Sequence, residues 1–168
     1  MPEHGLKVCK KLEALYLFEN RLTTISETML CFPKIKWLHL YDNHIQKIEN
    51  LDKLVNLQKL YLEKNMISRL EGLQNCPKLE ELSLQEQKLP RTTTFSFDEY
   101  SLAAIAGSLY SLNMAECQIL DCKPLYYCDR IETLNLRGNW IMDLEEQIIP
   151  LLTTIRGLST LDLRENEV

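Results

Sequence analysis

The stretch Leu57–Ile67 reads LQKLYLEKNMI, and its apolar residues recur at fixed intervals. Leu60 and Leu62 are two residues apart, so their side chains lie on the same side of a short extended strand, while Tyr61 points to the other side. Asn65 follows where the chain must turn out of the strand, and its amide can pair with backbone groups that the turn leaves free. The stretch therefore predicts a strand with one apolar face, followed by an asparagine turn.

The same pattern occurs seven times along the chain. Its copies start at residues 12, 35, 57, 79, 109, 131 and 158, so the steps are 22 or 23 residues long except for two of 30 and 27. This is the L-x-x-L-x-L-x-x-N/C-x-L pattern of leucine-rich repeats, whose units bury their leucines only by stacking on one another. We expect residues 1–168 to form a single α/β domain of about seven repeats. The predicted fold is a right-handed solenoid with a parallel sheet on its concave side and 3₁₀ or α-helical turns on its convex side.

The composition agrees with a folded solenoid and argues against other classes. Leucine accounts for 32 of the 168 residues, and 45% of the chain is apolar against 26% charged, unlike a disordered chain. Nineteen basic and 24 acidic residues give a formal charge of −5, which argues against a polybasic nucleic-acid-binding protein. No apolar run reaches the roughly 18 residues that a membrane span needs. We therefore expect neither nucleic acid nor a membrane as a partner.

The longest step contains an insertion, at about residues 90–108. Ser96 and Glu99 have the spacing of a capping box, and an apolar stretch follows them. This pattern predicts an α-helix over 98–106, ended by Gly107.

The second long step, over residues 144–156, is expected to hold another helix. Pro150 would lie inside it and predicts either a break or a late start of that helix. The repeats are incomplete at both ends of the chain, and neither end supplies a clear polar cap. We therefore expect that the chain is a piece of a longer protein or that a partner covers its ends.

The six cysteines fit the repeat pattern better than a disulfide framework. Cys9, Cys76 and Cys128 each lie three residues before the start of a repeat, where other units carry leucine, alanine or isoleucine, and this phase predicts a buried apolar column. Cys117 takes the place of a turn asparagine, where its thiol can act as a weak donor, and Cys122 has no assigned place. There is no Cys-x-x-Cys pair and no signal peptide. We expect reduced structural thiols and a cytoplasmic location.

The sequence carries no recognisable catalytic constellation. No metal motif joins its histidines, and it contains no phosphate-binding loop or nucleophile elbow. Glu80–Glu81 and Glu145–Glu146 are adjacent pairs whose side chains project in different directions, as solvated charges do. We expect a protein that is not an enzyme and has no catalytic residue, metal or cofactor.

The repeat pattern also identifies the side chains that face away from the leucine core, on the concave side that solenoids use for binding. Aromatic side chains concentrate there in the first three units, and a histidine lies among them: Tyr16, Phe18, Trp37, His39, Tyr41 and Tyr61. We call these six residues the aromatic surface. Exposed Trp, Tyr and Phe are typical of interface centres, so we predict protein binding. The alternative is that the rings only stack on one another across the sheet.

The residue before the turn asparagine is acidic in five of the seven units, and these residues form what we call the acidic row: Glu19, Asp42, Glu86, Glu116 and Glu165. One interpretation is a surface for a basic partner. The alternative is a solvated turn that accepts acidic residues. Glu63 and Glu81 also face the concave side, and together with Glu86 they complete the predicted protein-binding residues.

The 22-residue unit, with its Leu-x-Leu-x-x-Asn-x-Ile-x-x-Ile pattern, resembles the intracellular class of leucine-rich repeats typified by regulators of protein phosphatase 1. That class includes the leucine-rich light chain of outer-arm dynein and a spliceosomal protein. The segment Glu81–Pro90, in which Gln87 replaces the turn asparagine, and the insertion after it are similar to one phosphatase-regulating branch of the class. The resemblance implies a cytoplasmic or centrosomal adaptor for the phosphatase catalytic subunit, with microtubule association.

Two further points follow from this resemblance. The docking pattern of phosphatase regulators, basic-Val/Ile-x-aromatic, occurs at Lys34–Trp37. Ile35 is a core position of the repeat, however, so it cannot dock without breaking the fold. The alternative function is a structural component of a cytoskeletal, centrosomal or ciliary assembly, with tubulin or microtubule-associated proteins as partners.

Overall fold

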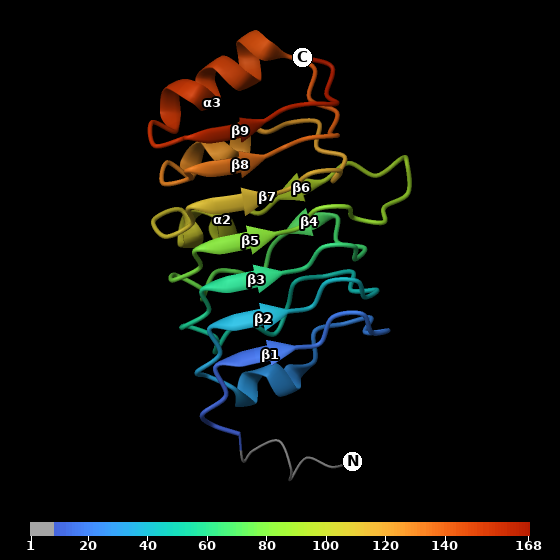
Figure 1. Ribbon diagram of the computed structural model, residues 1–168, viewed down its shortest axis with the longest axis vertical. Coiled ribbons are helices and arrows are strands. Elements are labelled where there is room, and N and C mark those ends of the chain that lie inside the picture. Colours follow the sequence, from blue (N-terminus) through green and yellow to red (C-terminus); the bar gives the residue numbers. More distant parts are fainter. Residues whose placement is uncertain (1–8) are drawn as a thin grey trace.

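The computed structural model describes residues 9–168, so the first eight residues of the predicted domain lie outside the described part. One short strand from each repeat joins a seven-stranded parallel sheet in the order β1-β2-β3-β5-β7-β8-β9 (Figure 1). The strands are β1 (Ala14–Tyr16), β2 (Trp37–His39), β3 (Lys59–Tyr61), β5 (Glu81–Ser83), β7 (Ser111–Asn113), β8 (Thr133–Asn135) and β9 (Thr160–Asp162). Each strand places its central leucine opposite the central leucine of its neighbour. The predicted solenoid with a parallel sheet is confirmed.

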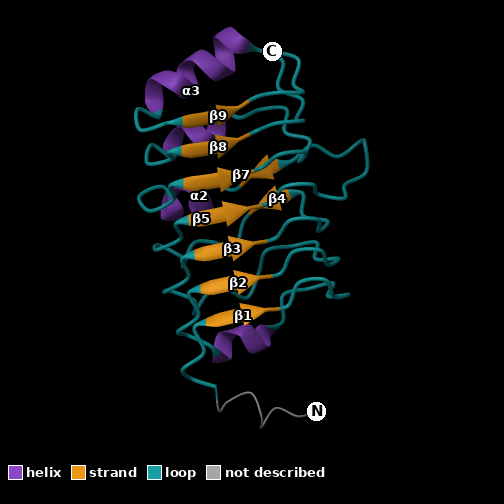
Figure 2. Ribbon diagram, in the orientation of Figure 1, coloured by secondary structure: helices purple, strands orange, loops and turns teal. Residues whose placement is uncertain are grey.

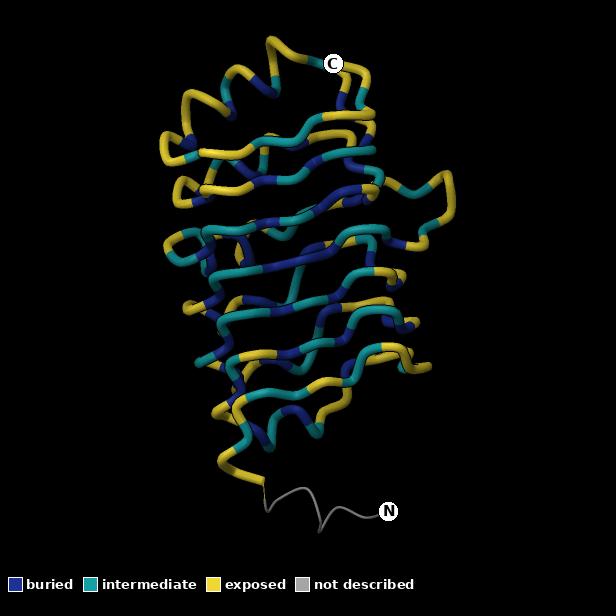
Figure 3. Tube along the Cα trace, in the orientation of Figure 1, coloured by how far each residue is buried: buried dark blue, intermediate teal, exposed yellow. Residues whose placement is uncertain are grey.

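The core is a continuous column of leucine and isoleucine behind this sheet. The central leucines of the inner strands, such as Leu60 and Leu134, are completely buried. Figure 3 shows buried segments at matching places in successive repeats. Leu15 and Leu161, in the first and last strands, are only partly buried because the described residues cover them from one side.

The convex side is made of short helices and turns; in the view of Figure 2, part of it lies behind the sheet, while one helix is seen below β1 and another above β9. It contains the 3₁₀ helices η1 (Glu27–Cys31) and η2 (Lys123–Tyr127), the α-helices α2 (Glu99–Ile105) and α3 (Ile149–Thr154), and the π-helix η3 (Leu144–Ile148). Residues 45–57 pass this side through turns alone. Two short strands, β4 (Arg69–Leu70) and β6 (Ser96–Phe97), form a separate parallel pair. No helix over residues 9–168 is long and apolar enough to cross a membrane.

Helix α2 lies within the insertion, but its start differs from the predicted capping box. The N-cap is Asp98, whose carboxylate accepts a hydrogen bond from the Ser101 N–H at 2.9 Å. Ser96 lies instead in β6, where its N–H donates to the Ser68 carbonyl at 3.0 Å, so it is part of a strand when the helix begins. The prediction of a Ser96 cap was therefore wrong by two residues. The helix ends just before Gly107, as expected.

The second insertion forms a helix in two parts. The Ile149 N–H donates to the Leu144 carbonyl, five residues back, which gives η3 its wider π turn. Pro150 then lies in the first turn of α3, where its missing N–H costs little. The α-helical part thus starts late, which was one of the two outcomes that Pro150 predicted.

Side-chain amides join each repeat to the one before it. Oδ1 of Asn65 accepts a hydrogen bond from the Ile45 N–H at 2.9 Å, and its Nδ2 donates to the Leu40 and Leu62 carbonyls at 3.0 Å each. The corresponding bonds are made by Asn43, Gln87 and Asn139. Cys117 takes the same place in the ladder, and its Sγ donates to the Leu84 carbonyl at 3.0 Å. This ladder satisfies buried backbone groups that the turns leave unpaired.

All six cysteines are free thiols. Cys76 and Cys128 are buried as the repeat phase predicted, and Cys122, which had no assigned place, is also part of the core. Burial raises the pKa of Cys122 to about 11, which keeps its thiol protonated. The prediction was wrong for Cys9, which is exposed. Among the described residues, no preceding repeat packs against it.

Candidate protein-binding surface

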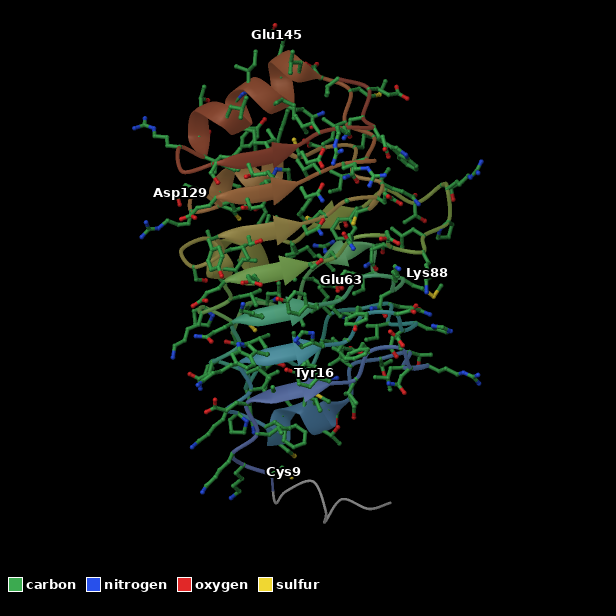
Figure 4. The ribbon with its side chains drawn as sticks, in the orientation of Figure 1. Cys9, Tyr16, Glu63, Lys88, Asp129 and Glu145 are labelled. Atoms are coloured by element: carbon green, nitrogen blue, oxygen red, sulfur yellow. The ribbon has the colours of Figure 1, made fainter. Side chains whose placement is uncertain are left out.

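The six residues of the aromatic surface lie together on the concave face, over β1, β2 and β3. Tyr16 is 57% exposed and Trp37 is 42% exposed, whereas the other four side chains are half-buried. Figure 4 labels Tyr16 over β1 and, two repeats further along the solenoid, Glu63 at the carboxyl end of β3. The leucine core does not require these side chains, because they point away from it.

The aromatic rings form two stacks across neighbouring strands. The His39 ring lies between Tyr16, at a centroid distance of 4.6 Å, and Tyr61, at 4.5 Å. Phe18 and Tyr41 form the second stack, with centroids 4.4 Å apart and planes 7° apart. Parallel strands in register lie about 4.8 Å apart, so equivalent positions bring their rings to stacking distance.

The expected alternative of stacking across the sheet is therefore present in the structure. It does not replace the binding hypothesis, which stays a prediction, because Tyr16 and Trp37 remain exposed and Trp37 belongs to neither stack. Stacking holds the rings in place before a partner binds. Binding would therefore cost little side-chain entropy of these residues. Burial, with a smaller effect of the Lys59 ammonium, lowers the pKa of His39 and so favours its neutral ring near pH 7.

Glu81 holds the next part of the surface in place. Its carboxylate accepts hydrogen bonds from Lys59 Nζ, the Tyr61 hydroxyl and the Tyr110 hydroxyl, each at 2.7 Å. Burial alone would raise the pKa of Glu81, but these three donors outweigh it and lower the pKa to about 2. Glu81 thus positions Tyr61 and is not a free charge for a partner. Tyr110 was missed by the sequence analysis, because it lies outside the Leu-x-Leu positions and nothing in its local sequence marks it.

This network predicts a pH dependence of stability. The pKa of Glu81 is about 2, below its ordinary value of 4.5, so the carboxylate stabilises the fold above about pH 4.5 and this contribution is lost as the pH falls towards 2. We expect Glu81→Gln to lower the free energy of unfolding at pH 7, by an amount that shrinks between pH 4.5 and 2. Urea unfolding of both proteins over this range measures the gap. Glu145→Gln, at an exposed position, is the control, and a gap independent of pH would contradict the assignment.

The acidic row is largely paired with basic neighbours. Four of its five members lie within 4 Å of a basic group, in the pairs Lys88–Asp42 at 2.9 Å, Lys64–Glu86 at 3.6 Å, Arg137–Glu116 at 3.6 Å and Arg137–Glu165 at 2.9 Å. The residue at this position has a φ of 51–66° in all seven units, including Gly138. Each residue of the acidic row therefore occupies a turn with left-handed backbone. This favours the interpretation of the acidic row as solvated turn residues. Among the described residues of the row, only Glu19 has no ion pair.

Ile35 is completely buried, so the phosphatase-docking pattern at Lys34–Trp37 is held in the fold, as expected. Over residues 9–168, no group of three or more histidine, cysteine or acidic side chains could hold a metal ion.

The comparisons with known proteins agree with this geometry. Residues 33–74 and 55–96 match the family model described as leucine-rich repeats in two copies. Residues 33–96 thus carry leucine-rich repeats, and the described chain folds as a leucine-rich repeat solenoid. A comparison with curated protein sequences found no match.

The chain is similar in fold to several solved structures. An internalin C2 from Listeria monocytogenes has a TM-score of 0.75 and 22% identity, over 97% of this chain and 66% of the internalin. A leucine-rich repeat protein from Leptospira interrogans has a TM-score of 0.77 and 24% identity, over 94% of this chain and 44% of that protein. The chain TLR13, solved in complex with ssRNA13, has a TM-score of 0.77 and 23% identity, over 92% of this chain and 22% of that one. At these identities the likeness concerns the fold alone, and the chain spans less than two thirds of each of these proteins.

Proposed function

We propose that the protein is a non-catalytic adaptor that binds a protein partner through its aromatic surface. The observation that carries this proposal is that Tyr16 and Trp37 stay exposed beside ordered aromatic stacks that the core does not need. Leucine-rich repeat domains generally bind proteins, and they do so with the concave face. Large aromatic side chains bury about 150–250 Å² each on contact and dominate interface energetics.

The partner that we propose is the catalytic subunit of a protein phosphatase 1 type enzyme, which the protein would regulate or target. The support is the resemblance of the segment Glu81–Pro90, with Gln87 before Leu-Pro, and of the helical insertion after it to protein phosphatase 1 regulatory subunit 42, also called testis leucine-rich repeat protein. This proposal places the protein in the cytoplasm, at the cytoskeleton or centrosome.

The second candidate is a structural component of a cytoskeletal, centrosomal or ciliary assembly. The leucines of the first and last repeats favour it, because Leu15, Leu17, Leu161 and Leu163 are only partly buried and would gain from packing against neighbouring proteins. Tubulin or a microtubule-associated protein would then be the partner.

Alanine substitution on the concave face tests the proposal. We expect Trp37→Ala to weaken binding of the purified phosphatase catalytic subunit by on the order of 2 kcal/mol, or about 30-fold, as at interface centres. Trp37 suits this test because it lies outside both stacks, whereas Tyr61→Ala, for which we expect a similar loss, also removes a donor to Glu81. Isothermal titration calorimetry measures both effects.

Tyr100→Ala is the matched control, because Tyr100 is 79% exposed on α2, behind the sheet. It should bind as the unchanged protein does. If Trp37→Ala and Tyr61→Ala also bind unchanged, the concave face is not the binding surface. If the catalytic subunit does not bind and the protein co-sediments with microtubules, the structural role replaces phosphatase regulation.

A further inference from the structure

A hollow of about 300 Å³ opens on the concave face at the edge of the aromatic surface, whose Tyr41 helps to line it. We call it the acidic hollow, and its lining comes from the residues that follow the strands of four successive repeats: Glu19, Tyr41, Asp42, Glu63, Lys64 and Gln85. Tyr41 and Glu63 occupy equivalent positions in neighbouring repeats, directly after the second leucine of the Leu-x-Leu pair. The space is enough for one long side chain and too small for a folded element.

The acidic hollow has two carboxylates without an ion pair. Asp42 is paired with Lys88 at 2.9 Å, and Lys64 is paired with Glu86 at 3.6 Å, so neither leaves a free charge. Glu19 and Glu63 have no such pair among the residues that the structure describes. Burial raises the pKa of the Tyr41 hydroxyl, and Glu19 and Glu63 raise it further, which places both carboxylates near this hydroxyl. The hollow therefore has an uncompensated negative charge beside an aromatic ring.

Two buried polar atoms on the concave face, one of them on the Glu63 side chain that lines the hollow, lack hydrogen-bond partners among the described residues. Glu63 Oε2 and Ser83 Oγ are buried and have no hydrogen bond within 3.5 Å among the described residues, although the Ser83 hydroxyl is near enough to the Glu63 carboxylate to lower its pKa. The Ser83 side chain is only 6% exposed, and it points to the concave face because it lies between the inward-facing Leu82 and Leu84. Buried polar groups without partners are rare in folded proteins, so each one asks for an explanation.

The charge of Glu63 is correspondingly disfavoured. Burial raises the pKa of Glu63, and the Glu86 carboxylate raises it further, while its own backbone N–H, the nearby Ser83 hydroxyl and Lys64 oppose this. A donor that carries a positive charge would both pair with Glu63 and lower its pKa.

We propose that the acidic hollow receives one cationic side chain of the protein partner, which pairs with Glu63 and Glu19 and lies beside the Tyr41 ring. Arginine fits best, since its planar guanidinium offers five donors, pairs with carboxylates in bidentate fashion and packs on aromatic rings. The inference rests on the proposed function, because it adds a specificity contact to the same concave face. A partner residue in this place would contact Tyr41, which belongs to the aromatic surface.

The probe is the Nα-acetyl amide of arginine, titrated at constant ionic strength into the full chain with isotope-labelled glutamate and tyrosine. We expect saturable NMR shifts of the Glu63 carboxyl and Tyr41 ring signals, together with a lower pKa of Glu63 in the bound state. The neutral isostere, the Nα-acetyl amide of citrulline, should give neither effect. Equal shifts with citrulline, or no saturable shift with the arginine and lysine amides, would overturn the proposal. Saturable binding of the lysine amide alone would still support a cation site.

Glu63→Gln tests the contact directly. This variant should weaken binding of the arginine probe at least tenfold, whereas Glu116→Gln should not change it, because Glu116 is already paired with Arg137. Glu63→Gln should fold at least as well as the unchanged protein near pH 7, since the fold disfavours the charged form that it removes. Unchanged probe binding by folded Glu63→Gln would exclude Glu63 as the partner of the cation.

The failure of this inference can be told apart from failure of the proposed function. Trp37 does not line the acidic hollow, so Trp37→Ala should keep the probe site. If Trp37→Ala loses the protein partner while Glu63→Gln keeps it at full affinity, the proposed function stands and the cation site is overturned.

Discussion

Asn65→Ala is expected to lower the free energy of unfolding by about 3–5 kcal/mol, because each buried polar group left without a partner costs about 1–3 kcal/mol. The Asn65 side chain makes hydrogen bonds to the Ile45 N–H and to the Leu40 and Leu62 carbonyls, and all of these groups are buried. Urea unfolding measures the loss. We expect the slope of the unfolding free energy against urea concentration to be the same for both proteins.

Asn20→Ala is the matched control for this prediction. Asn20 occupies the same place in the first repeat, but it is exposed and, within residues 9–168, donates only to the Leu17 and Phe18 carbonyls of its own unit. We expect its replacement to cost less than about 1 kcal/mol, as for an ordinary exposed hydrogen bond. Equal losses from the two substitutions would show that the bonds between repeats do not account for the stability of the ladder.

Gly72→Ala is the second substitution for which we expect a large effect. Gly72 has a φ of +73°, and a Cβ at this position would lie 2.1 Å from the Ile48 carbonyl oxygen. Left-handed backbone alone costs an alanine about 1–2 kcal/mol, and relieving the clash requires the neighbouring repeat to move, so we expect a total loss of at least about 3 kcal/mol. Thermal and urea unfolding measure it.

Gly107→Ala provides the comparison, because a Cβ there would meet no atom within 4 Å and the backbone is not left-handed. We expect this change to be neutral within about 0.5 kcal/mol, as is usual for surface substitutions. A loss at Gly72 no larger than at Gly107 would contradict the close approach of the two repeats.

The fold could be predicted from the sequence because its main signal is periodic. The alternation around Leu60 and Leu62 determines which side chains face the core, and repetition at 22 residues requires neighbouring units to stack. The start of α2 could not be predicted in the same way. Ser96 and Asp98 are both good N-caps, and the pairing of β6 with β4, which is not local, decides between them.

The candidate site was predictable only in part. The residues of the aromatic surface followed from the period of two, but their stacking depends on the spacing and register of the strands. Two of the three donors to Glu81, Lys59 and Tyr61, come from the neighbouring strand β3, and the third, Tyr110, follows the longest step in the pattern. The neutralisation of the acidic row depends on long basic side chains such as Lys88, which pairs with an acidic residue 46 positions earlier.

Hydroxyl-radical footprinting of the free and partner-bound protein tests binding through the concave face most directly. One experiment measures the reactivity of exposed aromatic side chains on both the concave and the convex face. Tyr16 and Trp37 are exposed on the concave face, while Tyr100 and Tyr127, 79% and 64% exposed, lie on the convex elements α2 and η2. With the phosphatase catalytic subunit bound, Tyr16 and Trp37 should become several-fold less reactive, and Tyr100 and Tyr127 should keep their reactivity. Protection of Tyr100 and Tyr127, with Tyr16 and Trp37 unchanged, would contradict binding through the concave face.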